Sequence, residues 1–231
     1  MIILTNDDGI DAPGLQALTT AVQKIGRSDI IIVAPRDHQS GCGHQVTTTA
    51  AIAVTQRSEN SYAIAGTPAD CTRIALNQLC RQPQFVLSGI NAGGNMGADV
   101  YISGTVAAVR EAALHRIPGI AISHYCQDQR AFDWDWAATI TAKLLADLLD
   151  RPQTPGYFWN INLPHLQPDA PQPAIIFCQP CTQPLPCDFR VEGEQFYYAG
   201  KYGNRQRDRG SDVEVCLGGN VAVTQLTILP N

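Results

Sequence analysis

The chain has 231 residues, of which 45% are hydrophobic and 16% charged, and its formal net charge at pH 7 is −5. This length and composition suit one large α/β domain, or one domain with a small appendage. The acidic balance argues against binding of nucleic-acid duplexes, and no run of about 18 apolar residues indicates a membrane span. Because no basic and apolar leader opens the sequence, we expect a soluble cytoplasmic protein.

The eight cysteines lie mostly among apolar residues. In a chain of this length without a secretion signal, reduced thiols are expected rather than a disulfide framework. Cys178 and Cys181 have C-x-x-C spacing, but a second such pair is missing and no histidine is close by in sequence. We therefore favour structural cysteines over a zinc site.

The first ten residues, MIILTNDDGI, predict a short buried strand that ends in Asp7 and Asp8. Two carboxylates at the edge of a sheet are costly unless water, hydrogen bonds or a cation compensates them. The periodicity of residues 15–25 predicts a helix, and the apolar run 29–35 predicts a second strand. This βαβ unit lacks a G-x-G-x-x-G sequence, so the dinucleotide fingerprint is absent where it is expected.

The next segment begins with a polar loop at residues 36–43, which contains Ser40 and is expected to face Asp7 and Asp8. Residues 44–49, 51–55 and 61–65 look like strands. Residues 66–79 (GTPADCTRIALNQL) predict a helix that starts with an N-cap threonine, a proline at N1 and an aspartate at N3.

Another buried strand is predicted at residues 84–90, followed by a glycine- and asparagine-rich loop at 91–99. Such a loop lets the backbone approach a ligand closely. It leads into a helix over residues 101–114 that Ser103 or Thr105 would cap. Free N–H groups at that start suit a phosphate, although a well-capped core helix is an equally good explanation from these residues alone.

The α/β pattern continues with a strand at residues 118–123, an amphipathic helix at 132–149 and a strand at 157–163. Beyond residue 163 the chain is rich in proline, then predicts a hairpin that turns near Gly193. The basic stretch Lys201–Arg209 is best explained as a solvated loop, with a loop that reaches the substrate as the alternative. A last strand is expected at residues 220–228.

Four loops should therefore meet at one face of the sheet, and their side chains carry carboxylate, hydroxyl and amide oxygens. That set suits a hard cation such as Mg²⁺ or Mn²⁺. Both Asp7 and Asp8 reach one ion only if the chain turns there, because neighbours on a strand point in opposite directions. The alternative is that Asp8 belongs to a simple turn and that Asp7 caps a helix.

The same stretches resemble the SurE (survival protein E) family of metal-dependent nucleoside monophosphate phosphatases, which are also called 5′-nucleotidases. The resemblance covers residues 1 to about 165, and the matching sequences are LTNDDGI, VAP with a following SG, GTPADC, SGINAGGNMGAD and SGTV. It implies a Rossmann-like three-layer α/β/α fold with a mostly parallel sheet, and a C-terminal β-hairpin extension. We expect residues 1–165 to form the catalytic core. Residues 166–231 would add the connection, a projecting hairpin used for oligomerisation and a strand that returns to the core.

Carried over by position, the resemblance implies that one divalent metal ion, Mg²⁺ or Mn²⁺, is bound by Asp7, Asp8, Ser40 and Asn91, with Asp7 and Asp8 also catalytic. It implies a phosphate-binding set of Asn95, Ser103, Gly104 and Thr105. Family members are usually homodimers or homotetramers. The chain stops at Asn231, where many members continue with a further helix, and this puts the oligomeric state in question more than the chemistry.

The expected reaction is hydrolysis of nucleoside 5′-monophosphates, with 3′-monophosphates as an open extension, by attack of a metal-activated water. An aspartyl-phosphate route is the competing mechanism. His44 is a candidate for protonating the leaving group, but a structural role is the better explanation. A metal- and nucleotide-binding protein without turnover is the alternative function, and a nucleotide-sugar transferase site is a weaker one.

Overall fold

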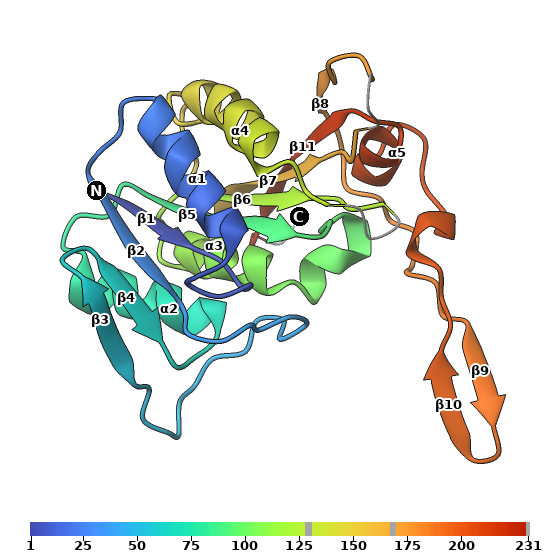
Figure 1. Ribbon diagram of the computed structural model, residues 1–231, viewed down its shortest axis with the longest axis horizontal. Coiled ribbons are helices and arrows are strands. Elements are labelled where there is room, and N and C mark those ends of the chain that lie inside the picture. Colours follow the sequence, from blue (N-terminus) through green and yellow to red (C-terminus); the bar gives the residue numbers. More distant parts are fainter. Residues whose placement is uncertain (128–130, 167–169, 230–231) are drawn as a thin grey trace.

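The computed structural model describes residues 1–127, 131–166 and 170–229, and Figure 1 shows their arrangement. A nine-stranded sheet crosses the molecule in the order β3-β4-β2-β1-β5-β6-β7-β11-β8. The neighbouring pairs from β4 to β7 are parallel, whereas β3 and β11 run antiparallel to β4 and β7. The chain is therefore an α/β protein with a mostly parallel sheet, as predicted.

The central strands form because continuous apolar runs lose their solvent contact on both faces of a parallel sheet. Ile3, Leu4, Val33 and Leu87, for example, are fully buried. The predicted strands are confirmed with small shifts at their ends: β1 (Ile2–Thr5), β2 (Ile30–Pro35), β5 (Phe85–Ala92), β6 (Gly119–His124) and β7 (Tyr157–Leu163).

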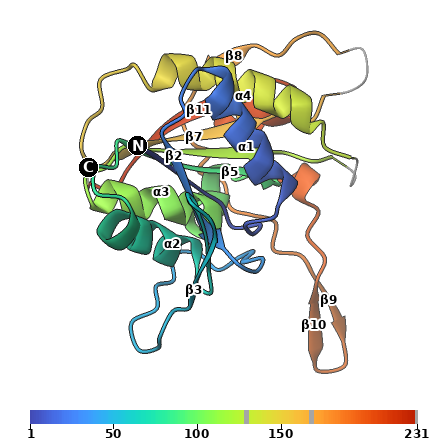
Figure 2. The same cartoon turned by 60° about the vertical axis from the view of Figure 1, so that its left-hand side comes forward.

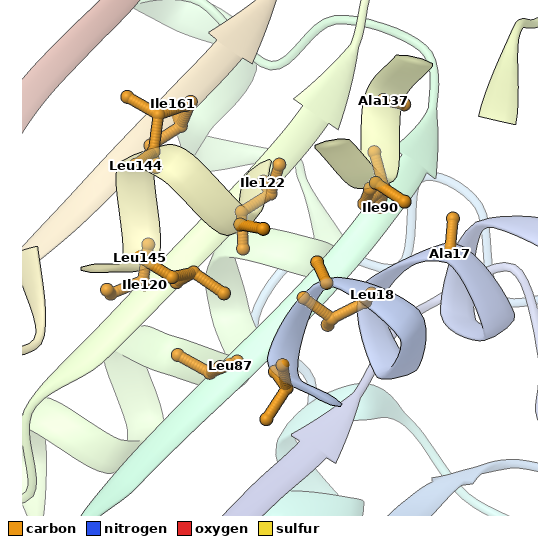
Figure 3. Close-up of a cluster of buried hydrophobic side chains, with 14 of the residues drawn as sticks. Ala17, Leu18, Leu87, Ile90, Ile120, Ile122, Ala137, Leu144, Leu145 and Ile161 are labelled. Atoms are coloured by element: carbon orange, nitrogen blue, oxygen red, sulfur yellow. The ribbon is translucent and has the colours of Figure 1, made fainter. Parts of the chain in front are cut away.

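Helices cover both faces of this sheet, which gives three layers (Figure 2). On one face lie α1 (Pro13–Lys24) and α4 (Trp134–Leu148); on the other lie α2 (Pro68–Ile74) and α3 (Gly104–Leu114). Figure 3 shows the core under α1 and α4, where Leu18 and Leu145 pack on Leu87, Ile120 and Ile122. Each fully buried aliphatic side chain of this kind contributes about 1.5–3 kcal/mol.

Local sequence chemistry sets the helix starts. Thr67 caps α2 and accepts a hydrogen bond from the Asp70 N–H, while the Asp70 side chain accepts from the Thr67 N–H, so the predicted capping box is present. α2 continues through a π-helical turn, η1 (Ala75–Leu79), to the predicted end. Ser103 caps α3, and α1 ends just before Gly26 as expected.

One strand prediction is wrong. Residues 44–49 form no strand, and the described sheet starts instead with β3 (Val54–Ser58) and β4 (Ser61–Ile64). The segment's polar groups bond the cap of α2: the Thr47 N–H and hydroxyl donate to the Asp70 carboxylate, and the Thr67 hydroxyl donates to the Gln45 carbonyl. Side-chain partners thus replace the ladder that a strand would need.

The C-terminal third leaves the core and returns to it. After β8 (Ile175–Phe177), a hairpin of β9 (Phe189–Glu192) and β10 (Gln195–Tyr198) projects away from the body in both Figure 1 and Figure 2. The chain then forms η3 (Tyr202–Asn204), α5 (Asp212–Leu217) and β11 (Val221–Thr227), which pairs with β7. Within the described residues, no helix is long and apolar enough to cross a membrane.

Candidate functional site

The two carboxylates lie at the carboxyl end of β1, beside the end of β5. β1 and β5 are neighbouring parallel strands, and Thr5 pairs with Ser88. Asp7 and Asp8 directly follow β1, and Asn91 lies near the end of β5. Ligands bind at this edge of open α/β sheets. The chain bends at Asp7 and Asp8, where the Asn6 side-chain amide donates to the Gly9 carbonyl (2.7 Å).

Asp7 is a buried acid, with only 6% of the residue exposed. Its Oδ1 accepts a hydrogen bond of 2.5 Å from the Thr105 hydroxyl. Burial, with a smaller contribution from the negative charge of Asp8, raises the pKa of Asp7 to about 6 against the opposing effect of the Thr105 hydrogen bond. Without a cation, therefore, ionised Asp7 is an unfavourable charge in a desolvated place.

The start of α3 packs directly against Asp7. A side chain at Gly104 would put its Cβ 2.9 Å from the Asp7 Cβ and 3.0 Å from Asp7 Oδ2, so only glycine lets the helix come this near. The Ser103 side chain accepts from the Val106 N–H (3.1 Å), and the first helical bond runs from Ala107 to Ser103. The Gly104 N–H precedes that bond and has no partner within the helix, whereas the Thr105 N–H donates to the Asp7 carboxylate.

Asp8 is half-buried and is held from two sides. Its Oδ2 accepts the Ala92 N–H of β5 at 2.9 Å, which ties the first loop to the glycine-rich loop. Its Oδ1 lies 3.4 Å from Nδ1 of His38, an exposed histidine of the loop after β2. Nothing in the sequence pattern singled out His38 beyond its place in the polar loop at residues 36–43.

Ser40 and Asn91 reach the same edge from two different strands. The Gln39 N–H donates to the Asp7 carbonyl (2.8 Å), which brings the exposed Ser40 to the neighbourhood of Asp7. The Asn91 amide nitrogen donates to the Gly93 carbonyl (2.8 Å), so its amide oxygen is the atom available for a ligand. Among the predicted site residues, Asp7 is hydrogen-bonded to Thr105 and packs against Gly104, which joins the Asp7–Asp8 pair to the start of α3.

Asn95 is placed differently. It is buried, and its side-chain amide donates to Ser123 Oγ (2.8 Å). Its backbone carbonyl accepts from the side chains of Asn160 and Asn162, and its N–H donates to Asn162 (2.8 Å). These contacts show Asn95 as the anchor of the glycine-rich loop on β6 and β7. The two polar residues in the apolar strand at 157–163 were the sequence signal for this network.

The donor set fits a hard divalent cation. Within the described ranges, no cluster of three or more His, Cys, Asp or Glu side chains is placed to hold a metal, so a site here combines two carboxylates with neutral oxygens. Asp7 supplies a buried carboxylate, and burial leaves it in need of a positive neighbour. Carboxylate, amide and hydroxyl oxygens are the ligands that Mg²⁺ and Mn²⁺ prefer.

His44 has a structural partner. Its Nε2 lies 2.7 Å from Glu111 Oε2 on α3, and Glu111 also faces His115 at 3.2 Å and Arg73 at 3.6 Å. Because His44 is engaged in this cluster, it ties the segment after Ser40 to α3. The structural explanation that the sequence favoured for His44 agrees with these contacts.

The stretch Lys201–Arg209 is not simply solvated. Arg205 is buried, and its Nη1 donates to Asp99 Oδ2 at 2.7 Å, with the Tyr202 hydroxyl on the same oxygen. The buried Asp212 carboxylate accepts from the Gly97 and Cys181 N–H groups, both at 2.8 Å. The C-terminal segment is therefore bonded to the glycine-rich loop, which no local pattern in the sequence revealed.

Comparisons with known proteins show which family the chain is similar to. The family described as "Survival protein SurE" matches residues 2–183. A protein of Nostoc sp. (strain PCC 7120), whose name gives it provisionally as a 5′-nucleotidase, is 63% identical over 227 residues, which are 98% of this chain and 99% of that one. The "5′-nucleotidase SurE" of Geotalea daltonii is 34% identical over 97% of this chain and 92% of its own. A crystal structure of the SurE protein from Aquifex aeolicus matches with a TM-score of 0.86 and 27% identity, over 100% of this chain and 94% of that chain.

Proposed function

Because the chain belongs to the survival protein SurE family, we propose that it is a metal-dependent phosphomonoesterase that hydrolyses nucleoside 5′-monophosphates to nucleoside and phosphate. Nucleoside 3′-monophosphates are a second proposed substrate class. The single observation that carries this proposal is the contact of Asp7 with the first turn of α3: the buried carboxylate lies directly against the N-terminus of the helix. In this arrangement the carboxylate suits a cation, and the helix N-terminus suits an anion.

We assign the metal ligands to Asp7, Asp8, Ser40 and Asn91. The hydrogen bond from the Ala92 N–H orients Asp8, and the Thr105 hydroxyl orients Asp7, so protein donors position both carboxylates for the cation. When bound, Mg²⁺ or Mn²⁺ would polarise a phosphoryl oxygen and lower the pKa of a water molecule. We favour attack by water over an aspartyl-phosphate intermediate, because both carboxylates are held by protein donors as ligands are.

The phosphate is held, in our proposal, by the first turn of α3. We assign the Gly104 N–H as a donor to the anion, and Ser103 fixes the turn through its cap. The Thr105 hydroxyl and N–H are both bonded to Asp7, so we assign Thr105 to the phosphate site through its place in this turn. We assign Asn95 the task of supporting the glycine-rich loop, because its side chain is bonded to Ser123.

The rest of the chain supports this site. We propose that residues 1–165 are the catalytic core and that residues 166–231 extend it without forming an independent domain, since β11 pairs with β7. We place the protein in the cytoplasm, because the described cysteines form no disulfide and a reducing compartment keeps thiols in that state.

The decisive experiment is a phosphate-release assay on the purified protein with nucleoside monophosphates and Mn²⁺, Mg²⁺ or EDTA. We expect release with either metal and none with EDTA. Binding of nucleotide without release under every metal would favour the alternative, a binding protein without turnover. Full activity in Asp8→Asn would contradict the assignment of the site.

We further propose a homodimer or homotetramer that uses the β9–β10 hairpin. The hairpin exposes Phe189, Val191, Phe196 and Tyr198, and exposed apolar surface of this kind marks interaction sites. Replacing Val191 and Phe196 together by serine should lower the mass seen by analytical ultracentrifugation to that of one chain. An unchanged mass, or a monomer before substitution, would contradict the role of the hairpin.

A further inference from the structure

A cleft of about 750 Å³ lies beside the glycine-rich loop, and none of the residues assigned to the metal or the phosphate lines it. Its walls come from three separate segments: residues 92–94 at the end of β5 and just beyond it, residues 125–127 after β6, and residues 201–204, which include η3. Ala92 belongs to both sites, because its N–H donates to Asp8 while the residue lines the cleft. One ligand can therefore touch the carboxylates and occupy the cleft.

Two tyrosine rings flank the cleft. The rings of Tyr125 and Tyr202 are stacked with their centroids 6.0 Å apart and their planes at 28°. Gly94 lies between them: a Cβ there would come 3.4 Å from the Tyr202 hydroxyl and 3.6 Å from Tyr125 Cδ2. Because Gly94 has no side chain, the glycine-rich loop passes close to both rings.

The tyrosine wall is held rigidly. The Tyr202 hydroxyl donates to Asp99, and the Arg205 guanidinium, which also bonds Asp99, lies 5.0 Å from the Tyr202 ring centroid. Burial raises the pKa of Tyr202 well above its usual range, so this hydroxyl stays protonated and keeps donating. A preorganised aromatic face loses little entropy when a planar ligand stacks on it.

The charge of the cleft matches an anionic substrate. Among the described residues that line it, Lys201 is the charged side chain, and Asn204 adds an amide with both donor and acceptor atoms. We propose that this cleft binds the nucleoside part of the substrate: the base packs against the tyrosine wall at Tyr125, and Lys201 and Asn204 contact its polar edge. The inference rests on the proposed function and adds to it a source of specificity.

This chemistry predicts a broad preference for bases over a simple sugar phosphate. Stacking on an aromatic side chain tolerates any base, because every base has a π-face. A matched pair of substrates isolates the contribution of the base: AMP and ribose 5-phosphate share the phosphate and the sugar, and only AMP has a ring to stack. Nitrophenyl phosphate is unsuitable because it carries an aromatic ring itself.

The test compares KM for AMP and for ribose 5-phosphate in wild type, Tyr125→Phe, Tyr125→Leu and Lys201→Ala. Tyr125→Leu should raise the KM for AMP on the order of tenfold relative to that for ribose 5-phosphate. Tyr125→Phe keeps the ring and should leave the ratio of KM for AMP to KM for ribose 5-phosphate unchanged. Lys201→Ala, at an exposed position, should raise that ratio without affecting folding. Tyr62→Leu, the same exchange on β4, should leave the ratio unchanged.

An equal effect of Tyr125→Leu and Lys201→Ala on both substrates, or none on either, would overturn the assignment of the cleft while the proposed function stands. Release of phosphate from neither substrate by wild type would contradict the proposed function instead. In that case titration calorimetry of AMP in EDTA tests the cleft directly: weaker binding to Tyr125→Leu than to wild type supports it, and equal binding overturns it.

Discussion

Asp7 is a carboxyl group that the fold has taken out of water and placed beside a second carboxyl group. Burial raises its pKa to about 6. A proton and a cation therefore compete for the Asp7 carboxylate. In the absence of metal, Asp7 contributes stability below its usual pKa of 3.8, and that contribution is lost as the pH rises through about 6. Metal binding to Asp7, in contrast, becomes stronger as the pH rises through this range.

We predict that the affinity for Mn²⁺ falls as the pH drops below about 6, by up to tenfold per pH unit, because the metal then has to displace the proton of Asp7. Above pH 7 this group causes no further change. Titration calorimetry at pH 5.0, 6.0 and 7.5 in buffers that do not bind metal measures the effect. A constant affinity across that range would show that Asp7 is not a ligand.

Sequence alone was sufficient for individual residues where the chemistry is local. The position of Asp7 and Asp8 at the end of a buried strand was predicted correctly, and of the two predicted caps of the next helix, Ser103 and Thr105, Ser103 is the one found. It was not sufficient for contacts between distant segments. The hydrogen bond from Thr105 to Asp7 and the approach of His38 to Asp8 depend on which strands lie side by side, and no local pattern encodes that order.

At the level of elements, two helices begin with the same kind of cap but only one faces the candidate site. Ser103 accepts from the Val106 N–H at the start of α3, and Asp133 accepts from the Trp136 N–H at the start of α4. Ser103 is buried beside the carboxylates, whereas Asp133 is exposed. A comparison of Ser103 with Asp133 therefore separates the contribution of a cap to stability from its contribution to phosphate binding.

Ser103→Ala and Asp133→Ala should each lower the free energy of unfolding by about 1 kcal/mol, because each leaves an N–H without its partner. Only Ser103→Ala should also weaken phosphate binding, seen as a higher KM for AMP, since the first turn of α3 is then less well fixed. Urea denaturation and steady-state kinetics measure the two effects. Equal KM changes in both variants would argue against a phosphate-binding site at the start of α3.

Elements with a strong period or a complete cap were predictable, and short ones with side-chain partners were not. The apolar runs predicted the central strands, and the capping box predicted the start of α2. The segment at residues 44–49 resembled a strand, but its backbone bonds the side chains of Thr67 and Asp70. α5 has only six residues, too few for a periodic signal, and it depends on Asp212, which accepts N–H groups from remote loops.

For the whole molecule, the main long-range connection is the buried pair of Arg205 and Asp99. It joins the segment before α5 to the glycine-rich loop across more than a hundred residues, and the Arg205 side chain is fully buried. Such a pair gives little net stability over an apolar substitute, but loss of one partner leaves a buried charge without compensation. The exposed pair of Arg57 and Asp11 is a natural control.

Arg205→Ala should destabilise the protein by about 3–5 kcal/mol, because Asp99 then keeps a buried charge. The double variant Arg205→Met with Asp99→Asn should lose less, and Arg57→Ala should cost less than about 1 kcal/mol. Denaturant unfolding of the three variants tests this order. A loss from Arg205→Ala no larger than that from Arg57→Ala would contradict the role of the pair as the link to the C-terminal segment.

The central claim is that Asp7 and Asp8 together bind the divalent cation on which hydrolysis depends. Its most direct test is calorimetric titration of Mn²⁺ into metal-free wild type, Asp7→Asn, Asp8→Asn and Asp11→Asn at pH 7.5. Asp11 is an exposed acid on the same segment and provides the control. We predict one Mn²⁺ per chain in wild type and in Asp11→Asn, and at least tenfold weaker binding in Asp7→Asn and in Asp8→Asn. Equal binding in all four proteins would contradict the claim.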